Sequence, residues 1–360
     1  MATCALGLGV AGCASTRDSS VRGDVYGFED RTARVVTPRV QASTTTGDAT
    51  LTPYWKADVI SAATPVMSAP DAISRATEYS EVRHEAGLGT SWSLDDRETV
   101  GGSYTLSVEP DYVSHRVGLT VAREMFDDRL TLGTGATFGF DRIGTSDMPE
   151  FEATLFTLGG ELSTSWVLSA TLLGHVVYTF EQRSGYQANP YRYVPIFEGT
   201  MRPTSVLPES LPDTRRRHAW EGLLVASLDA DTFVHAGYRF YVDDWGIVSH
   251  TARVAAWREL LGDSLRVRVR ARGYTQGAAS FYRLRYESPL AFRTGDYRYS
   301  PMSTVGGGLR LDLRLDELLA PETLVVTGAY DLTYFILPMY AVFSRMIANM
   351  LWVGVQLEVP

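Results

Sequence analysis

The sequence predicts an all-β fold, namely a transmembrane, antiparallel, up-and-down β-barrel of about sixteen strands, with about fourteen as the lower bound. The clearest observation is the segment 265–272, in which four arginines alternate with four apolar residues. Successive side chains of a strand point to opposite faces, so this segment has one apolar face and one cationic face. The same alternation recurs along the chain, and the connections between alternating segments are by turns short and long. Membrane barrels, with lipid outside and water inside, have this pattern.

The composition suits strands that cross a membrane. The chain has 360 residues, of which 45% are hydrophobic, and it contains no uninterrupted apolar run of about 18 residues that would predict a transmembrane helix. Only alternate residues of a barrel strand meet lipid, so a moderate hydrophobic fraction is sufficient. Because the formal net charge is −9, we expect no nucleic-acid partner.

Residues 1–13 resemble the apolar core of an export signal. No positive residue precedes this core, so we expect the natural start to lie upstream. Its last four residues, 10–13, resemble a bacterial lipobox, which predicts lipidation of Cys13, whereas a cleaved signal with an incidental cysteine explains the segment equally well. Cys4 and Cys13 are the only cysteines, so residues 14–360, expected to form a single barrel, have neither a disulfide nor a thiolate metal site.

Sixteen segments have the alternation of membrane strands, and most reach the roughly 9–11 residues that a tilted strand needs. The first segment has the weakest pattern. A soluble sandwich or propeller is the alternative fold, but sandwich strands are usually shorter, about 5–6 residues. The predicted strands are 21–28, 33–45, 50–62, 78–93, 98–108, 112–125, 129–141, 152–167, 170–183, 215–229, 232–242, 247–260, 264–276, 299–315, 323–337 and 347–359.

The connections alternate in length in a way that orients the barrel. One set consists of tight turns built from glycine and aspartate, such as Gly47-Asp48, Asp127-Asp128 and Gly262-Asp263. The other set includes three long loops, 63–77, 184–214 and 277–298. Membrane barrels have short periplasmic turns and longer external loops, so the long loops are predicted to be external and both barrel ends periplasmic.

The sequence also contains an internal echo. The triplet at 113–115 recurs at 248–250, and Arg123-Glu124 recurs as Arg258-Glu259 at the same offset. Similar matches make four consecutive predicted strands resemble the four that lie six strands later. Repetition at a fixed period favours duplication, although all barrel hairpins share some features.

The arginine-rich segment and the segment 299–315 supply the candidate lumen site. Arginines that faced lipid near the midplane would cost about 2–4 kcal/mol each, so these charged side chains are predicted to face the lumen. One interpretation is a positive strip that guides anionic solutes. The other is that neighbouring carboxylates such as Asp312 and Asp316 neutralise the arginines. We expect that some arginines pair with carboxylates and that an excess of positive charge remains. The candidate strip is Arg266, Arg268, Arg270, Arg272, Arg310, Asp312 and Arg314.

No catalytic, metal or cofactor site is predicted. His84, His115, His218 and His250 lie on four non-adjacent strands and on the apolar face, so they cannot converge on one ion. In Ser114-His115 and Ser249-His250 the two side chains point to opposite faces and cannot form a nucleophile–base pair. We therefore expect no enzyme and keep a membrane-embedded hydrolase as a remote alternative.

The long segment 184–214 is the candidate for external ligand contact. Its prolines stiffen it, and its aromatic and arginine side chains suit sugars, phosphates or a partner. Folding inward as a constriction and lying outside as a lid are equally compatible with the sequence. The external contact candidates are Tyr191, Arg192, Tyr193, Asp243, Asp244 and Trp245.

Several of these segments resemble one family of bacterial outer-membrane proteins, the domain of unknown function 3570. The stretch Gly237–Gly246 is the most specific match, and the resemblance covers nearly all of the mature chain. The resemblance implies an outer-membrane barrel and supplies no reaction, ligand or catalytic residue. The other matching stretches are 58–63, 79–85, 189–195, 211–215, 274–276, 281–283 and 297–300.

We therefore expect a barrel in the outer membrane of a Gram-negative bacterium, in contact with membrane lipid and lipopolysaccharide. The first functional expectation is a porin-like channel for small polar or anionic solutes, because barrels of this size usually leave a water-filled lumen. The alternative is a non-conducting structural or assembly barrel that anchors or encloses a periplasmic or surface protein, as part of an export or electron-transfer conduit.

Overall fold

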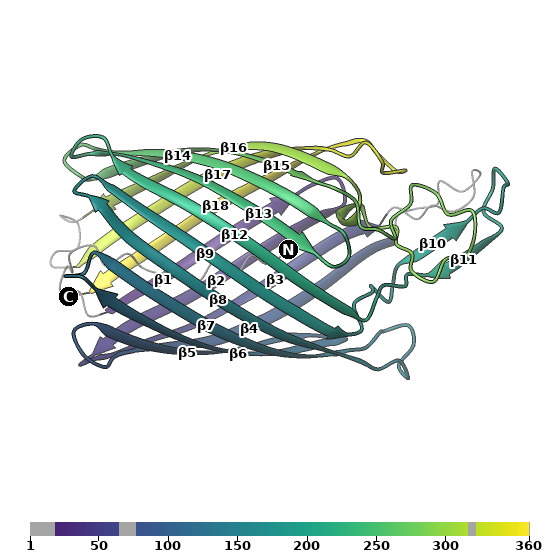
Figure 1. Ribbon diagram of the computed structural model, residues 1–360, viewed down its shortest axis with the longest axis horizontal. Coiled ribbons are helices and arrows are strands. Elements are labelled where there is room, and N and C mark those ends of the chain that lie inside the picture. The colour runs from purple at the N-terminus through teal and green to yellow at the C-terminus, as the bar shows by residue number, and fades with distance from the viewer. Residues whose placement is uncertain (1–18, 65–76, 316–321, 360) are drawn as a thin grey trace.

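The computed structural model describes residues 19–64, 77–315 and 322–359, and its main element is a closed antiparallel barrel of sixteen strands (Figure 1). Each strand pairs with its neighbours in the chain, and β1 pairs with β18 to close the barrel. The barrel strands are β1 (Ser19–Glu29), β2 (Ala33–Thr46), β3 (Ala49–Thr64), β4 (Thr77–Ser93), β5 (Glu98–Glu109), β6 (Tyr112–Met125), β7 (Leu130–Ile143), β8 (Ala153–Ser169), β9 (Leu172–Gly185), β12 (Thr214–Ser227), β13 (Thr232–Asp243), β14 (Val248–Leu260), β15 (Leu265–Gln276), β16 (Met302–Leu315), β17 (Thr323–Ile336) and β18 (Arg345–Val359).

All sixteen predicted strands are confirmed, and every boundary lies within about three residues of the expected one. Even the first segment, whose pattern is weakest, forms a strand, because it pairs along its whole length with both β2 and β18. Its partners run from Val359, opposite Ser19, to Asn349, opposite Glu29. The barrel therefore has no free strand edge in the described chain, which is what a hydrocarbon environment demands.

The two faces of the wall follow the predicted alternation. Large apolar side chains such as Val269, Leu309 and Leu351 are exposed on the outer face, where lipid would cover them. The polar and charged residues that alternate with them point into the lumen, and ion pairs link many of them across strands. No helix of the described residues has the length and apolarity needed to cross a membrane.

The tight turns gather at one end of the barrel and the long loops at the other. Asp127, Asp128 and Asp263 adopt left-handed backbone conformations, as do Gly47 and Gly262, which is why glycine and aspartate occupy these turns. Ser19 and Val359 lie at the same end as these turns, as expected. The expected export signal with Cys13, Asp316 and most of the loop 63–77 lie outside the described residues.

Sequence analysis missed a small structured unit on the long-loop side. The segment 186–213 contains a hairpin of β10 (Tyr193–Ile196) and β11 (Ser205–Pro208), and the segment 277–301 contains a 3₁₀ helix, η1 (Tyr297–Tyr299). The hairpin lies beyond the end of the barrel (Figure 1), so an inward constriction by this hairpin is wrong. Isolated bridges join the two segments, namely Ile196 to Tyr286 and Ser210 to Arg293. We call these two segments together the external module.

The internal echo has a structural counterpart on the outer wall. The Tyr104 hydroxyl lies 2.8 Å from Nδ1 of His115, and the Tyr238 hydroxyl lies 2.6 Å from Nδ1 of His250. Both pairs join two adjacent strands, β5 with β6 and β13 with β14. The echoed residues therefore make the same contact twice, as a duplicated barrel segment would.

Candidate functional site

The arginine strip occupies the lumen face of β15 and is framed by β14 and β16. Strand pairing places Arg266 between Glu259 and Asp312, and it places Arg268 between Trp257 and Arg310. On the same strand, Arg270 lies opposite Gly308, and Arg272 lies opposite Arg253 and Gly306. The structure thus brings the predicted strip together on one continuous patch of the wall. Along this patch, some arginines have carboxylate partners and others contact aromatic rings.

Two of the four β15 arginines have carboxylate partners on neighbouring strands. Nε of Arg266 lies 3.0 Å from Oε1 of Glu259 on β14. Nε of Arg270 lies 2.6 Å from Oδ1 of Asp331 on β17, so this pair reaches across the intervening β16. Gly308 on β16 makes the reach feasible, because a Cβ atom at this position would lie 1.8 Å from Oδ1 of Asp331.

The predicted charged residues of β16 are also paired. Arg310 binds Asp312 on its own strand, with Nε 2.9 and 2.8 Å from the two carboxylate oxygens. The Thr327 hydroxyl donates to the same carboxylate at 2.6 Å. Arg314 lies 4.0 Å from Glu358 of β18. Asp312 therefore compensates mainly the charge of Arg310, and the partners of the β15 arginines are Glu259 and Asp331, which sequence analysis did not single out.

Arg268 and Arg272 have no carboxylate within ion-pair distance in the described part of the chain. The guanidinium carbon of Arg268 lies 5.6 Å from the ring centre of Trp257, and that of Arg272 lies 5.2 Å from the ring centre of Tyr274. These are cation–π contacts, which orient a guanidinium group without neutralising its charge. Both cations therefore remain available to a solute in the lumen.

Two further lumen arginines, Arg239 on β13 and Arg253 on β14, extend the strip and were missed by sequence analysis. Both contact Glu221 on β12: Arg253 through a hydrogen bond from Nη2, and Arg239 with Nε at 3.8 Å. The central part of this patch then combines seven arginines with four carboxylates, an excess of three positive charges; the count leaves out Arg215, Arg217 and Arg314, which pair with Asp243, Glu181 and Glu358. The arginines are Arg239, Arg253, Arg266, Arg268, Arg270, Arg272 and Arg310, and the carboxylates are Glu221, Glu259, Asp312 and Asp331.

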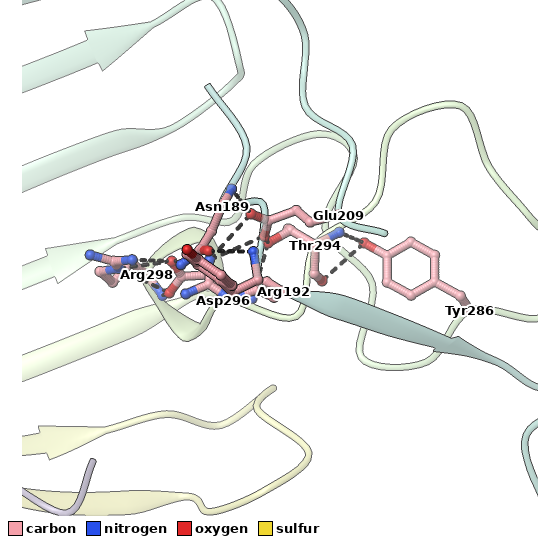
Figure 2. Close-up of polar contacts among 8 residues, drawn as sticks. Asn189, Arg192, Glu209, Tyr286, Thr294, Asp296 and Arg298 are labelled. Carbon is pink, nitrogen blue, oxygen red and sulfur yellow. Dashed lines mark hydrogen bonds and ion pairs between the residues drawn. The ribbon is translucent and has the colours of Figure 1, made fainter. Parts of the chain in front are cut away.

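The external module is held together by a buried ionic network (Figure 2). Nη1 of Arg192 lies 2.9 Å from Asp296 and 3.2 Å from Glu209, which belong to two different loop segments. The side chains of Glu209 and Asp296 are only 1% and 3% exposed. Arg298 also binds Asp296, with Nε 2.8 Å from Oδ2, and the Asn189 amide donates to Glu209 at 2.7 Å. Arg192 therefore cross-links the two segments and is not a free contact residue.

The cations of this network also set the charge state of Asp296. Burial alone would raise the pKa of its carboxyl group, but Arg192 and Arg298 beside it hold the pKa below its ordinary value. The same contacts raise the pKa of Arg192 despite its burial. The network is therefore ionised at neutral pH.

The other predicted contact residues are divided between structural and surface positions. Asp243 is buried against Arg215, with Oδ2 3.0 Å from its Nε, and Nε1 of Trp245 donates to the Thr214 carbonyl at 2.7 Å. Tyr191 donates a hydrogen bond to Asp111, whereas Tyr193 is 52% exposed. Asp244 is exposed, and together with Trp245 it helps to line a cavity of about 270 Å³. The remaining lining residues are Pro212, Thr214, Ser280, Phe281 and Phe292.

The predicted positions of the histidines are confirmed: three of them bind tyrosines on the outer wall, and His84 stacks on Trp55. Among the described residues, the acidic groups that do converge are Glu81, Glu109 and Asp111, and one carboxylate oxygen from each lies within 4.8 Å of the other two. Arg83 contacts Glu109 at 3.7 Å, so a cation of the protein already balances part of this charge.

One serine–histidine pair on the lumen face lies within hydrogen-bond distance, which the adjacent residues Ser114-His115 and Ser249-His250 cannot reach. Oγ of Ser165 on β8 lies 2.7 Å from Nδ1 of His175 on β9. Within the described residues, no carboxylate accepts a hydrogen bond from His175 to orient its ring. A serine hydrolase needs such an orienting group, so the geometry gives this pair no triad.

Comparison with known proteins identifies the family and the fold. The sequence model described as "Protein of unknown function (DUF3570)" matches residues 37–326. No curated protein sequence matches this chain. A solved structure described as a bacterial polysaccharide outer membrane secretin is 8% identical, with a TM-score of 0.55 over 96% of this chain and 99% of that chain.

Two Pseudomonas aeruginosa structures are less similar. The siderophore receptor PirA is 11% identical, with a TM-score of 0.45 over 89% of this chain and 56% of that chain, so this chain spans about half of the receptor. OccK2 (OpdF), solved with glucuronate, is 10% identical, with a TM-score of 0.46 over 96% of this chain and 99% of that chain. The fold of an outer-membrane β-barrel is shown by the likeness to the secretin structure, whose TM-score is above 0.5.

Proposed function

We propose a function from the premise that the chain belongs to the DUF3570 family and folds as an outer-membrane barrel: it forms a channel for small polar solutes that prefers anions. One observation carries the proposal, the unneutralised charge of Arg268 and Arg272 on the lumen wall. The membrane that fits is the outer membrane of a Gram-negative bacterium, where lipid and lipopolysaccharide would surround the apolar wall.

The charge balance supports anion preference over cation preference. Arginine stays protonated at every physiological pH, so the excess of positive charge on the lumen patch is permanent. A ring or strip of fixed cations raises the local concentration of anions and lowers that of cations in a narrow pore. Barrels of sixteen or more strands usually leave an aqueous lumen in which such a strip can act.

Liposome swelling with the purified full chain tests this proposal. Vesicles that contain the barrel should admit gluconate faster than sorbitol, which has the same carbon skeleton without the carboxylate charge. Removing two charges with Arg268→Gln and Arg272→Gln should abolish the difference, whereas Arg266→Gln, which removes an arginine paired with Glu259, should leave most of it. Equal entry of gluconate and sorbitol into vesicles of the unaltered protein would overturn anion preference.

A second candidate function is a barrel that anchors a surface partner, and the external module favours it. The module has its own buried network and its own small apolar core of Val194, Ile196 and Tyr286. A rigid platform beyond the membrane suits protein contact better than a flexible loop does. Deleting residues 197–204 at the hairpin tip should then abolish partner recovery from intact cells while leaving solute entry unchanged.

A further inference from the structure

Three lumen arginines from three adjacent strands lie close together in the external half of the barrel and have one carboxylate between them to balance their charge. Arg272 of β15 lies directly opposite Arg253 of β14, and Arg239 of β13 lies diagonally across from Arg253. Side chains in such positions are about 5 Å apart when opposite and about 7–8 Å apart when diagonal. Arg272 feels the positive charges of both Arg253 and Arg239. The only carboxylate that contacts this cluster in the described residues is Glu221, on the far side of Arg253.

Like charges directly opposite each other destabilise a sheet, so this arrangement needs a compensating anion. Glu221 compensates one charge of the three and binds Arg253 and Arg239, but it does not contact Arg272. The cluster is left with two uncompensated positive charges. Water in the lumen screens part of the repulsion, and a bound anion would remove the rest.

Glycines lie opposite both arginines of the pair on the strands that flank β14 and β15. Gly306 lies opposite Arg272 on β16, and Gly237 lies opposite Arg253 on β13. A Cβ atom at Gly237 would lie 2.8 Å from Nε of Arg253, so the arginine side chain folds over this glycine. At Gly306 a Cβ atom would lie 2.8 Å from the Leu332 carbonyl oxygen. The space over Gly237 is therefore taken by Arg253 itself, and that over Gly306 by the Leu332 carbonyl and the Thr333 hydroxyl, so neither glycine adds a side chain between the arginines and the lumen.

We propose that Arg253 and Arg272 bind a tetrahedral oxyanion dianion of the phosphate class, either inorganic phosphate or a phosphomonoester, with Arg239 completing the site. The two negative charges match the two uncompensated positive charges of the cluster. Guanidinium groups bind phosphate oxygens in a bidentate manner, and a tetrahedral anion offers oxygens in more than one plane. One such anion can accept from guanidinium groups on two different strands, and it brings two negative charges where a carboxylate brings one.

The inference that phosphate is the transported solute rests on the proposed channel function. Binding of phosphate to the site needs only access of water to the lumen. The two claims can therefore fail separately. A barrel that binds phosphate without conducting would overturn the channel and keep the site. A barrel that conducts anions without binding phosphate would overturn the site and keep the channel.

Isothermal titration of the full-length folded barrel at pH 8 and constant ionic strength tests the site. The probes are inorganic phosphate, glycerol 3-phosphate and acetate. Phosphate should bind at least about tenfold more tightly than acetate, because at pH 8 it carries two negative charges against the two uncompensated positive charges, and acetate carries one. Tight binding of inorganic phosphate alone identifies the free ion as the ligand, and tight binding of both phosphate probes identifies the phosphomonoester class. Acetate binding as tight as phosphate binding would overturn the proposal.

Matched variants on one strand locate the site. Arg272→Gln should weaken phosphate binding at least about tenfold, and Arg272→Lys should weaken it less, because it keeps the charge and loses the planar fork. Arg266→Gln, two positions beyond Arg268 on β15 and paired with Glu259, should leave the affinity unchanged. Each variant is first shown to be folded by its heat-modifiable migration. Equal loss of affinity in Arg266→Gln and Arg272→Gln would overturn the assignment, because binding would then reflect only the general charge of the lumen.

Discussion

At the scale of single residues, the net positive charge of the strip depends on which of its arginines have a carboxylate partner. Asp331 neutralises Arg270 only because Gly308, on the strand between them, has no side chain to block its path. Arg268 and Arg272, on either side of Arg270, contact aromatic rings in place of carboxylates. Small changes at the partner residues should therefore change the charge of the lumen without touching an arginine.

Replacing Asp331 with asparagine should increase anion preference. The variant Asp331→Asn removes the charge that compensates Arg270 and adds a third free cation between Arg268 and Arg272. The reversal potential in a salt gradient should shift further toward the anion side. Asp229→Asn makes the same charge change in an exposed turn at the barrel end and should not shift it, so equal shifts in both variants would contradict the account.

Removing Arg192 should destabilise the external module locally. Arg192→Met leaves Glu209 and Asp296 buried without their shared cation, and breaking a buried ion pair in this way costs about 3–5 kcal/mol. Hydrogen exchange of the amides in Val194–Ile196 measures the free energy of local opening. Arg34→Met, which breaks an exposed pair with Glu29, should change the stability of its own turn by less than about 1 kcal/mol. Similar losses in the two variants would argue against a buried network.

Residue types and alternation were sufficient to predict which side chains of β15 and β16 face the lumen, because a one-residue slip would put arginine into lipid. They could not predict the partners Glu259 and Asp331. Those pairs depend on the register between strands, and in one case on a glycine in the intervening strand. Arg239 and Arg253 were missed because neither belongs to a run of alternating arginines in its own strand, and they form a cluster only after the strands pair.

At the scale of elements, the strands were predictable and the external module was not. Each barrel strand alternates over ten or more residues, which is a strong local signal. The strands β10 and β11 are only four residues long, and both contain proline. Their order comes from contacts with the segment 277–301, such as the bridge from Ile196 to Tyr286, and no local pattern reports such contacts.

The external module should lose its order in acid and not in base. The folded-state pKa of Asp296 lies below its ordinary value. The ionised network therefore stabilises the module fully at pH values above the unfolded pKa of Asp296, about 4. This stabilisation is lost as the pH falls through the lower pKa of the folded state. Hydrogen exchange of 193–208, corrected for the intrinsic rate at each pH, should show constant protection from pH 8 to 5 and a loss below about pH 4. A loss between pH 8 and 6 would point to a different titrating group. Peptides from β13 serve as the control.

At the scale of the whole molecule, the chain combines a negative net charge of −9 with a positive patch inside the barrel. The positive charge is concentrated on β13 to β16, one side of the lumen, and the repeat of outer-wall Tyr–His contacts links β13 and β14 to β5 and β6. If these strands arose by duplication, the arginine cluster belongs to one copy alone, because the residues of β7 that align with the β15 arginines are uncharged. The positive charge of the lumen is then a difference between the two copies of the repeat.

Single-channel recording of the purified full chain in a planar bilayer decides whether this barrel is an anion-preferring channel. An anion-preferring channel should give stable conductance steps with a reversal potential on the anion side in a potassium chloride gradient, and Arg268→Glu should shift that potential toward the cation side. The absence of conductance from a barrel that is folded and heat-modifiable would contradict the channel function. A selectivity that Arg268→Glu leaves unchanged would contradict the role of the arginine strip.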